Sequence, residues 1–272
     1  MAPLNVEADA KRVYDVLKAG GTAVVPMSVG YAICSTNPTA MERIFSTKQR
    51  GAHKRHGMGG SYELHKQVHI MEPVHAEIVH TLVKTLGLPM GVVAKYDRDN
   101  PIIKNIDATT LQEATNGDNM AMLIGAGDLQ DEIIKLTSAE AMPVLGSSAN
   151  ISGTGPSTIK DEVVNGFANI IHTGTKYRIE DIQPEILEVA DLVIDYGLVK
   201  WWVHGRASTM LDFSGPTIEV VRIGACYETI KDALKRFWNI DLPSDPGHAS
   251  LPSGHLKNLQ PLESLQRLTA KV

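Results

Sequence analysis

The most informative stretch of the chain is Val144-Leu145-Gly146-Ser147-Ser148-Ala149-Asn150-Ile151-Ser152-Gly153. An apolar run leads into a group of hydroxyl and carboxamide side chains and then stops at a glycine. This order is typical of a buried strand that carries polar side chains to a binding site. Hydroxyl and amide groups bind phosphate or carboxylate oxygens without adding a fixed charge. The stretch therefore predicts a strand that ends at a site for an anionic ligand.

A cluster of cations far upstream complements this strand end. Lys48 and Arg50 lie at the end of a predicted helix, where an isolated pair usually complements the helix dipole. Here a glycine follows directly, and Lys54 and Arg55 add two further charges. Four cations on one loop can close over a polyphosphate. We expect the loop and the strand end to meet in one site, with a nucleotide as the natural ligand.

Four further residues are candidates for the same site. Ser28 and Tyr31 follow a predicted strand, and a tyrosine there either stacks on a base or packs half-buried. Arg222 is a single charge in an apolar run, so it needs solvent, a ligand or a partner such as Asp212. Ser208 lies on the strand that precedes it in the chain.

Histidines are concentrated between positions 53 and 80. They occur in three spaced pairs: His53 and His56, His65 and His69, His75 and His80. No His-Glu-x-x-His motif accompanies them, and no carboxylate or cysteine stands at a matching position, so a metal site is not predicted. His53 or His56 is instead a candidate general acid or base beside the anion site.

The composition sets limits on the class of protein. The chain has 272 residues, of which 43% are hydrophobic and 21% charged, and its formal net charge is −5. This balance disfavours wide-area binding to nucleic acid or to an anionic membrane. Two cysteines do not indicate a disulfide framework, and neither a secretory signal nor a membrane span is recognisable. We expect a cytoplasmic protein.

Apolar periodicity and turn residues give the predicted elements. Helices are expected over residues 6–19, 39–47, 73–86, 129–137, 158–165, 227–238 and 261–268. Strands are expected over residues 22–26, 91–94, 120–124, 190–195, 207–213 and 218–223, and before Ser147. Residues 48–69 are expected to form a basic surface loop. The irregular mixture predicts one α/β domain with a mixed sheet over residues 1–240, followed by a C-terminal extension over 241–272.

The motifs resemble those of the YrdC-like family of threonylcarbamoyl-adenylate synthases. The family pairs a Lys-x-Arg with a later Ser-x-Asn, which here are Lys48-Gln49-Arg50 and Ser148-Ala149-Asn150. Residues 25–31, 207–212 and 221–225 resemble three further family segments, in the family's order. The resemblance implies a YrdC/RibB-like domain, a twisted mixed sheet flanked by helices. Family members use ATP, bicarbonate and L-threonine for tRNA modification.

This resemblance implies roles for the candidates. It implies a nucleotidyltransferase-like enzyme that uses ATP, with or without magnesium, on a small-molecule substrate, without a direct tRNA or membrane partner. The candidate catalytic residues are Lys48, Arg50, His53 and His56. The candidate nucleotide- or substrate-binding residues are Ser28, Tyr31, Lys54, Arg55, Ser147, Ser148, Asn150, Ser208 and Arg222.

Several positions depart from the family pattern and keep two alternatives open. Met27 and Val29 stand where the family has threonines, and residues 54–56, 88–91 and 123–125 also differ. Polar groups are lost, while the anion-binding residues remain. One alternative is a divergent enzyme that has abandoned ATP, with no cofactor, and transforms a small carboxylated metabolite in specialised metabolism. The other is a non-catalytic RNA-binding module.

Overall fold

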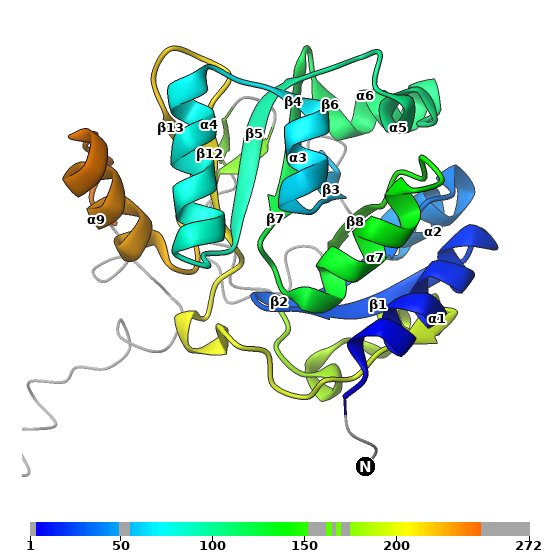
Figure 1. The fold of residues 1–272 in the computed structure, drawn as a ribbon. Coiled ribbons are helices and arrows are strands. Elements are labelled where there is room, and N and C mark those ends of the chain that lie inside the picture. Colours follow the sequence, from blue (N-terminus) through cyan, green and yellow to red (C-terminus); the bar gives the residue numbers. More distant parts are fainter. Residues whose placement is uncertain (1–3, 49–54, 152–161, 165–166, 170–174, 246–272) are drawn as a thin grey trace, which may run out of the picture.

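The computed structural model describes residues 4–48, 55–151, 162–164, 167–169 and 175–245. Within these residues, eleven strands form one mixed sheet with the path β11-β1-β2-β8-β3-β7-β5-β12-β13 (Figure 1). Strand β4 pairs with β5, β6 pairs with β7, and β9 and β10 form a separate pair. Helices α1, α7, α3 and α4 lie along the front of the sheet in Figure 1, and α9 lies at one side.

The strands are β1 (Thr22–Met27), β2 (Gly30–Ser35), β3 (Gly57–Gly59), β4 (His69–Ile70), β5 (Met90–Tyr96), β6 (Thr115–Asn116), β7 (Asn119–Ile124), β8 (Leu145–Ser148), β9 (Glu162–Val164), β10 (Phe167–Asn169), β11 (Leu192–Val193), β12 (Thr209–Asp212) and β13 (Glu219–Arg222). The α-helices are α1 (Val6–Lys18), α2 (Pro38–Thr47), α3 (Tyr62–Val68), α4 (Pro73–His80), α5 (Pro101–Lys104), α6 (Ala108–Ala114), α7 (Asp128–Ser138), α8 (Pro184–Glu188) and α9 (Tyr227–Trp238). A π-helical turn, η1 (Thr81–Thr85), extends α4, and η2 (Ile179–Asp181) and η3 (Trp202–His204) are 3-10 turns. The predicted α/β class, with one mixed sheet flanked by helices, is confirmed.

Helix α1 shows how local sequence and burial agree. The side-chain oxygen of Asn5 accepts a hydrogen bond from the backbone N–H of Ala8, at 3.0 Å, and caps the helix. Ala10, Val13 and Leu17 recur on one face and are fully buried. Gly20 follows the helix with a φ of +81°, a conformation that glycine adopts at little cost. The predicted helix over residues 6–19 is confirmed.

Strand β2 was not predicted from the sequence, although it is central to the site. It pairs antiparallel with β1 on one side and with β8 on the other. All six of its residues are buried, so the strand lacks the alternation of apolar and polar residues that marks a half-exposed strand. The register sets Ala32 opposite Ser148 and Ile33 opposite Ser147, which places the hairpin beside the polar strand end.

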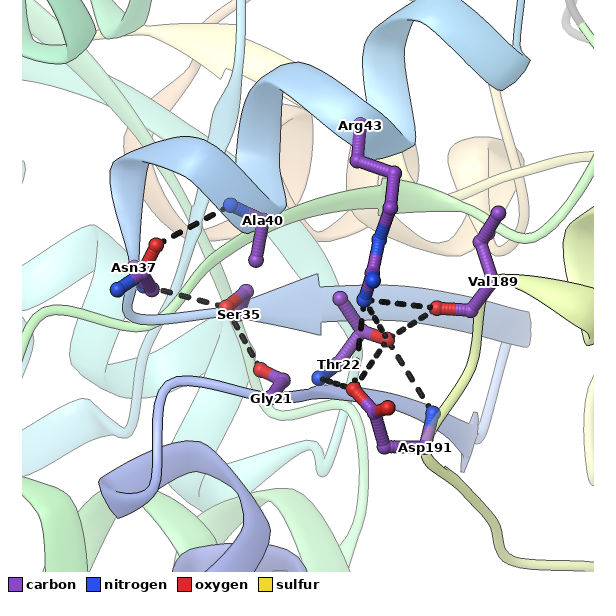
Figure 2. Close-up of polar contacts among 8 residues, drawn as sticks. All are labelled: Gly21, Thr22, Ser35, Asn37, Ala40, Arg43, Val189 and Asp191. Carbon is purple, nitrogen blue, oxygen red and sulfur yellow. Dashed lines mark hydrogen bonds and ion pairs between the residues drawn. The ribbon is translucent and has the colours of Figure 1, made fainter.

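A network of polar contacts fixes the start of α2 against β1 (Figure 2). Arg43 of α2 donates to the carboxylate of Asp191 and to the carbonyl of Val189, at 3.4 and 3.3 Å. The same carboxylate accepts the backbone N–H of Thr22 at 2.7 Å, which lowers the pKa of Asp191. Asn37 caps α2 at the backbone N–H of Ala40. The direction of α2 is therefore fixed, and its far end is presented to β8.

Two predicted elements differ from the structure. Residues 48–69 are not one loop, because β3, α3 and β4 occupy most of the described part of this range. Ser61 caps α3 at the N–H of Leu64, and Leu64 and Val68 are buried, which stabilises a short helix among polar residues. The helix predicted over residues 158–165 is contradicted at Glu162–Val164, which form β9; the remaining positions lie outside the described residues, as does the helix predicted at 261–268.

The last described residues pack back on the domain. Leu242 is buried, and the hydroxyl of Tyr227 donates to the carbonyl of Pro243 at 2.6 Å. Arg206 and Asp245 form a buried ion pair at 2.5 Å. Packing against the domain therefore continues to Asp245, a few residues past residue 240. The division of the chain into a domain and a C-terminal extension stays a prediction.

His65 and His69 contact each other inside the fold. Their Nδ1 atoms lie 2.8 Å apart, and both residues are buried. Burial lowers the pKa of His65 to about 4 and that of His69 well below its usual value. Within the described residues, no three His, Cys, Asp or Glu side chains are grouped as a metal ion would require.

Replacement of Gly146 by alanine is expected to destabilise the junction of β2 and β8. An added Cβ would lie 2.6 Å from the carbonyl oxygen of Ile33 and 2.9 Å from the Cβ of Cys34, so strand backbone must move. We expect a loss of about 1–3 kcal/mol in the free energy of unfolding, measured by urea denaturation. Gly57→Ala is the matched control, because its Cβ would meet only ordinary contact at 3.9 Å. Equal losses in the two variants would contradict the register.

The buried histidine pair is expected to make stability depend on pH. The pKa of His65 is lower in the folded state than in the unfolded chain, so the unfolded state binds more protons between about pH 6.5 and pH 4. Stability is complete above about pH 6.5 and falls as the pH drops, by about 2 kcal/mol at pH 5 for His65 alone. Urea denaturation of His65→Gln should show a smaller loss between pH 7.5 and 5. The exposed His80→Gln should behave as wild type.

Candidate functional site

The end of β8 forms a tight, internally bonded turn. The backbone N–H of Ala149 donates to the carbonyl of Tyr31 at 2.8 Å, and that of Asn150 donates to the carbonyl of Ser148 at 2.9 Å. Asn150 is only 2% exposed, and its side-chain nitrogen donates to the carbonyl of Ile151. Among the described residues, its side-chain oxygen has no hydrogen-bond partner. Buried acceptors are normally paired, so this oxygen is suited to a donor supplied by a ligand.

Lys48 brings the upstream segment to this strand end. Its side chain is buried, and its ammonium donates to the backbone carbonyls of Ser148 and Asn150. The predicted meeting of the two distant segments is confirmed by these contacts. In this arrangement Lys48 ties the end of α2 to the end of β8. Its predicted role in neutralising phosphate stays a prediction.

The remaining loop candidates fall into two sets. Arg50, His53 and Lys54 lie outside the described residues. Arg55 donates to the carbonyl of Gln112 at 3.0 Å, so part of its hydrogen-bonding capacity faces α6.

His56 has well-defined neighbours. Its Nε2 lies 3.0 Å from a carboxylate oxygen of Glu113, and its ring stacks on Phe45 with the ring centres 3.9 Å apart. Gly57 pairs with Gly146 on β8, and His56 directly precedes Gly57. The structure thus brings His56 to the same strand end as Lys48.

Ser28 and Tyr31 occupy different environments. The backbone N–H of Ser28 donates to the carbonyl of Ala126 at 2.6 Å, and its carbonyl accepts from the N–H of Trp201 at 2.8 Å. The Ser28 hydroxyl is buried and finds no hydrogen-bond partner in the part of the chain that the structure describes. Tyr31 is 1% exposed, and its hydroxyl donates to the carbonyl of Gly197 at 2.9 Å. Tyr31 is therefore a core residue here rather than an exposed surface for stacking.

Ser208 and Arg222 form a second group, at the β12–β13 pair. The guanidinium of Arg222 donates through Nε to the carbonyl of Ser208 at 2.8 Å, and through Nη2 to its hydroxyl at 2.9 Å. The suggested partner Asp212 instead accepts from the backbone N–H of Ser214. In the described part of the chain, no carboxylate forms an ion pair with Arg222. Burial lowers the pKa of its guanidinium to about 10, so it remains charged at neutral pH.

Gly224 allows the backbone after Arg222 to approach the backbone at Ala207 and Ser208. A Cβ at position 224 would lie 2.3 Å from the carbonyl of Ala207 and 2.5 Å from that of Ser208. Only a glycine lets the two backbones approach this closely. The close approach holds Ser208 within reach of Arg222.

β3, β7 and β5 separate the strand that leads to Asn150 from the strand pair that carries Arg222. Contacts on the β1–β2 side nevertheless reach this strand pair. The turn at Ser28 contacts Trp201, and the ring of Trp201 packs near that of His204. His204 lies 3.8 Å from the sulfur of Cys226, and the preceding Ala225 bridges to Ser208. Within the described residues, the β1–β2 turn is thus connected by contacts to the strand pair that carries Ser208 and Arg222.

Sequence reasoning missed Glu113, the carboxylate partner of His56. The two residues are 57 positions apart, and the end of α6, where Glu113 stands, carries no motif that points to a site. The stack of Phe45 on His56 was not predicted either. No helix in the described part of the chain combines the length and apolarity that a membrane crossing needs.

A family model covers more than half of the chain. The Sua5, YciO and YrdC model, described as "Telomere recombination", matches residues 15–174. The chain belongs to the Sua5/YciO/YrdC family. The match includes Lys48 and Asn150, but not Ser208 and Arg222. No curated protein matches the chain in sequence.

Solved structures agree with this family at the level of the fold. A hypothetical protein from Streptococcus mutans has a TM-score of 0.66 and 18% identity, covering 85% of this chain and 92% of that one. Sua5 of P. abyssi, complexed with L-threonine, has a TM-score of 0.60 and 17% identity, covering 92% of this chain and 62% of that one. YciO of E. coli has a TM-score of 0.58 and 19% identity, covering 82% and 91%. This chain thus spans less than two thirds of the length of Sua5.

Replacement of Lys48 by methionine is expected to destabilise the protein. Methionine keeps the apolar part of the side chain but removes the donor to two buried carbonyls. Loss of a partner for buried polar groups costs about 1–3 kcal/mol. Lys66→Met is the matched control, because Lys66 is exposed and pairs with Glu63 on the surface, where a change stays within about 0.5 kcal/mol. Urea denaturation of both variants checks this, and equal stabilities would contradict a tethering role for Lys48.

Proposed function

We propose that this protein is an enzyme that binds ATP and forms an acyl- or carbamoyl-adenylate. The family supports a function related to nucleotides or carbamoyl-adenylates, and the adenylate chemistry of this chain is our inference. The observation that carries the proposal is Arg222, a partly buried guanidinium whose hydrogen bonds within the described residues go to an uncharged serine. A charge withdrawn from water without a counter-ion is costly, and a bound anion supplies one.

The described residues suit different parts of a nucleotide. Arg222 would balance charge on a phosphate, and the hydroxyls of Ser28 and Ser208 would donate to phosphate or ribose oxygens. The unpaired oxygen of Asn150 would accept a hydrogen bond from an N–H or O–H of the ligand. Lys48 would hold the strand end in place for this contact. Mg²⁺ commonly keeps several waters and binds through nucleotide phosphates with few protein ligands, so it would arrive with ATP.

Formation of an adenylate requires that the reactants are positioned and that the developing negative charge is neutralised. A carboxylate or carbamate oxygen attacks the α-phosphorus of ATP, a P–O bond forms, and the bond to the leaving pyrophosphate breaks with its electron pair. Negative charge shifts towards the pyrophosphate oxygens in this step. A fixed guanidinium and hydroxyl donors stabilise that charge without a covalent intermediate on the protein.

Arg222→Gln is expected to weaken ATP binding by about 10- to 100-fold, because a hydrogen-bonded charge contributes about 1.5–3 kcal/mol. Isothermal titration calorimetry with ATP and Mg²⁺ measures the loss. Arg98→Gln is the matched control, since Arg98 is exposed and pairs with Asp118 at the surface, and it should bind ATP as wild type does. Pyrophosphate release stimulated by L-threonine with bicarbonate would identify the family reaction.

The same titration separates the two alternatives. Wild-type protein that does not bind ATP at millimolar concentration would contradict the proposal and favour an enzyme acting on a carboxylated metabolite. RNA binding that weakens steeply with salt would favour an RNA-binding module, since phosphate contacts release counterions. The net charge of −5 disfavours that module.

A further inference from the structure

Two large apolar side chains stand exposed at the turn η3. Trp202 is 51% exposed and Val203 is 62% exposed, and Leu198, shortly before them in the chain, is 37% exposed. Single exposed apolar residues are ordinary on a protein surface, but a concentration of them marks an interaction surface. Trp202 and Val203 together are the η3 surface.

The last described residues lead the chain to this surface. The hydroxyl of Tyr227, at the start of α9, donates to the carbonyl of Pro243 at 2.6 Å. Asp245 then forms its buried ion pair with Arg206, at 2.5 Å. Because Arg206 follows Val203 by three residues, their backbones are at most about 11 Å apart. The chain beyond Asp245 therefore starts near the η3 surface.

A second exposed aromatic residue, Phe237, lies on the opposite side of this exit. It is 60% exposed and belongs to the last turn of α9. The helix rises about 1.5 Å per residue, which places Phe237 about 15 Å along the axis from Tyr227. The contact of Pro243 with Tyr227 shows that the chain runs back towards the start of α9, away from Phe237.

The sequence after Asp245 contains a segment with a matching apolar face. The helix predicted over residues 261–268, outside the described residues, carries Leu262, Leu265 and Leu268. This spacing places the three leucines on one side of a helix, with polar residues on the other. A helix of this length is not stable alone in water, so it needs a surface to pack against. A connection of about 15 residues reaches up to about 50 Å when extended, which is enough to bring it to η3.

We propose that residues 261–268 bind the η3 surface of the same molecule, with their three leucines packed on Trp202 and Val203. The contact is apolar: leucine side chains leave water against an indole ring and an isopropyl group. Because the segment is tethered, it is presented at an effective concentration in the millimolar range, so a small contact area is sufficient. The interaction needs no nucleotide, and it stands or fails separately from the proposed function.

The direct test is ¹⁹F NMR of the full chain labelled with fluorotryptophan, with the Trp202 signal assigned by its loss in Trp202→Phe. We expect Leu265→Asp to shift the Trp202 signal, because a charged side chain removes the leucine face from the indole. Gln266→Asp is the matched control, since it adds the same charge at the neighbouring position, on the polar side of the predicted helix, and it should leave the signal in place. An identical Trp202 signal in wild type and Leu265→Asp would overturn the proposal.

Hydrogen exchange gives a second readout, from the side of the segment. The backbone amides of residues 261–268 should exchange about 10-fold faster in Val203→Asp than in wild type, because the helix loses the surface that stabilises it. Val203 is largely exposed, so this variant keeps the core intact. Phe237→Asp is the control and should exchange as wild type does. Faster exchange in Phe237→Asp alone would place the segment at the end of α9 and contradict the proposal.

Sedimentation equilibrium separates binding within one molecule from binding between two. We expect wild type and Leu265→Asp to have the same mass over a 100-fold range of concentration. A wild-type protein that self-associates, together with a monomeric Leu265→Asp, would mean that the segment binds a second copy of the chain. That result would also overturn the proposal.

Discussion

The structure depends on the position of β8 between β2 and β3. This short strand joins the hairpin of β1 and β2 to the rest of the sheet, and its register decides where its polar end lies. A shift of one residue would exchange the faces on which Ser147 and Ser148 stand. The ammonium of Lys48, held by the carbonyls of Ser148 and Asn150, opposes such a shift from the side of α2. The strand pairing of β8 and the buried contact of Lys48 therefore favour the same register, and the geometry of the candidate site depends on both.

The cations of the site differ in how their charges are balanced. The hydrogen bonds of Lys48 go to backbone carbonyls, which fix it as part of the framework. Arg222 is held just as firmly, yet its partner is a serine that carries no charge. Ion pairs such as Arg206 with Asp245 show that the same fold supplies carboxylates to buried arginines elsewhere. The proposed role of Arg222 toward an anion rests on this difference from Arg206.

Much of the fold was predictable from local patterns, and the rest depended on contacts distant in sequence. Helix α1 and the pair of β12 and β13 follow from apolar spacing and turn residues. The meeting of Lys48 with Asn150 was predicted from the complementary chemistry of two motifs. Strand β2 was missed because it is buried on both faces and shows no alternation. Helix α3 was missed because its polar composition hides Leu64 and Val68, which anchor it.

In the candidate site, too, contacts between residues distant in sequence could not be predicted from local patterns. Glu113 had no local signal, since its contact with His56 depends only on where α6 ends relative to His56. Tyr31 was considered as a surface for a base, but position in sequence does not reveal that its hydroxyl closes onto Gly197 in the core.

The stack of Phe45 on His56 has a consequence for the interpretation of variants. Phe45 belongs to α2 and His56 directly precedes β3, so the two rings couple the end of the helix to the start of the strand. A substitution of either ring therefore disturbs both elements at once. Its effect on a bound ligand becomes interpretable only beside its effect on the free energy of unfolding.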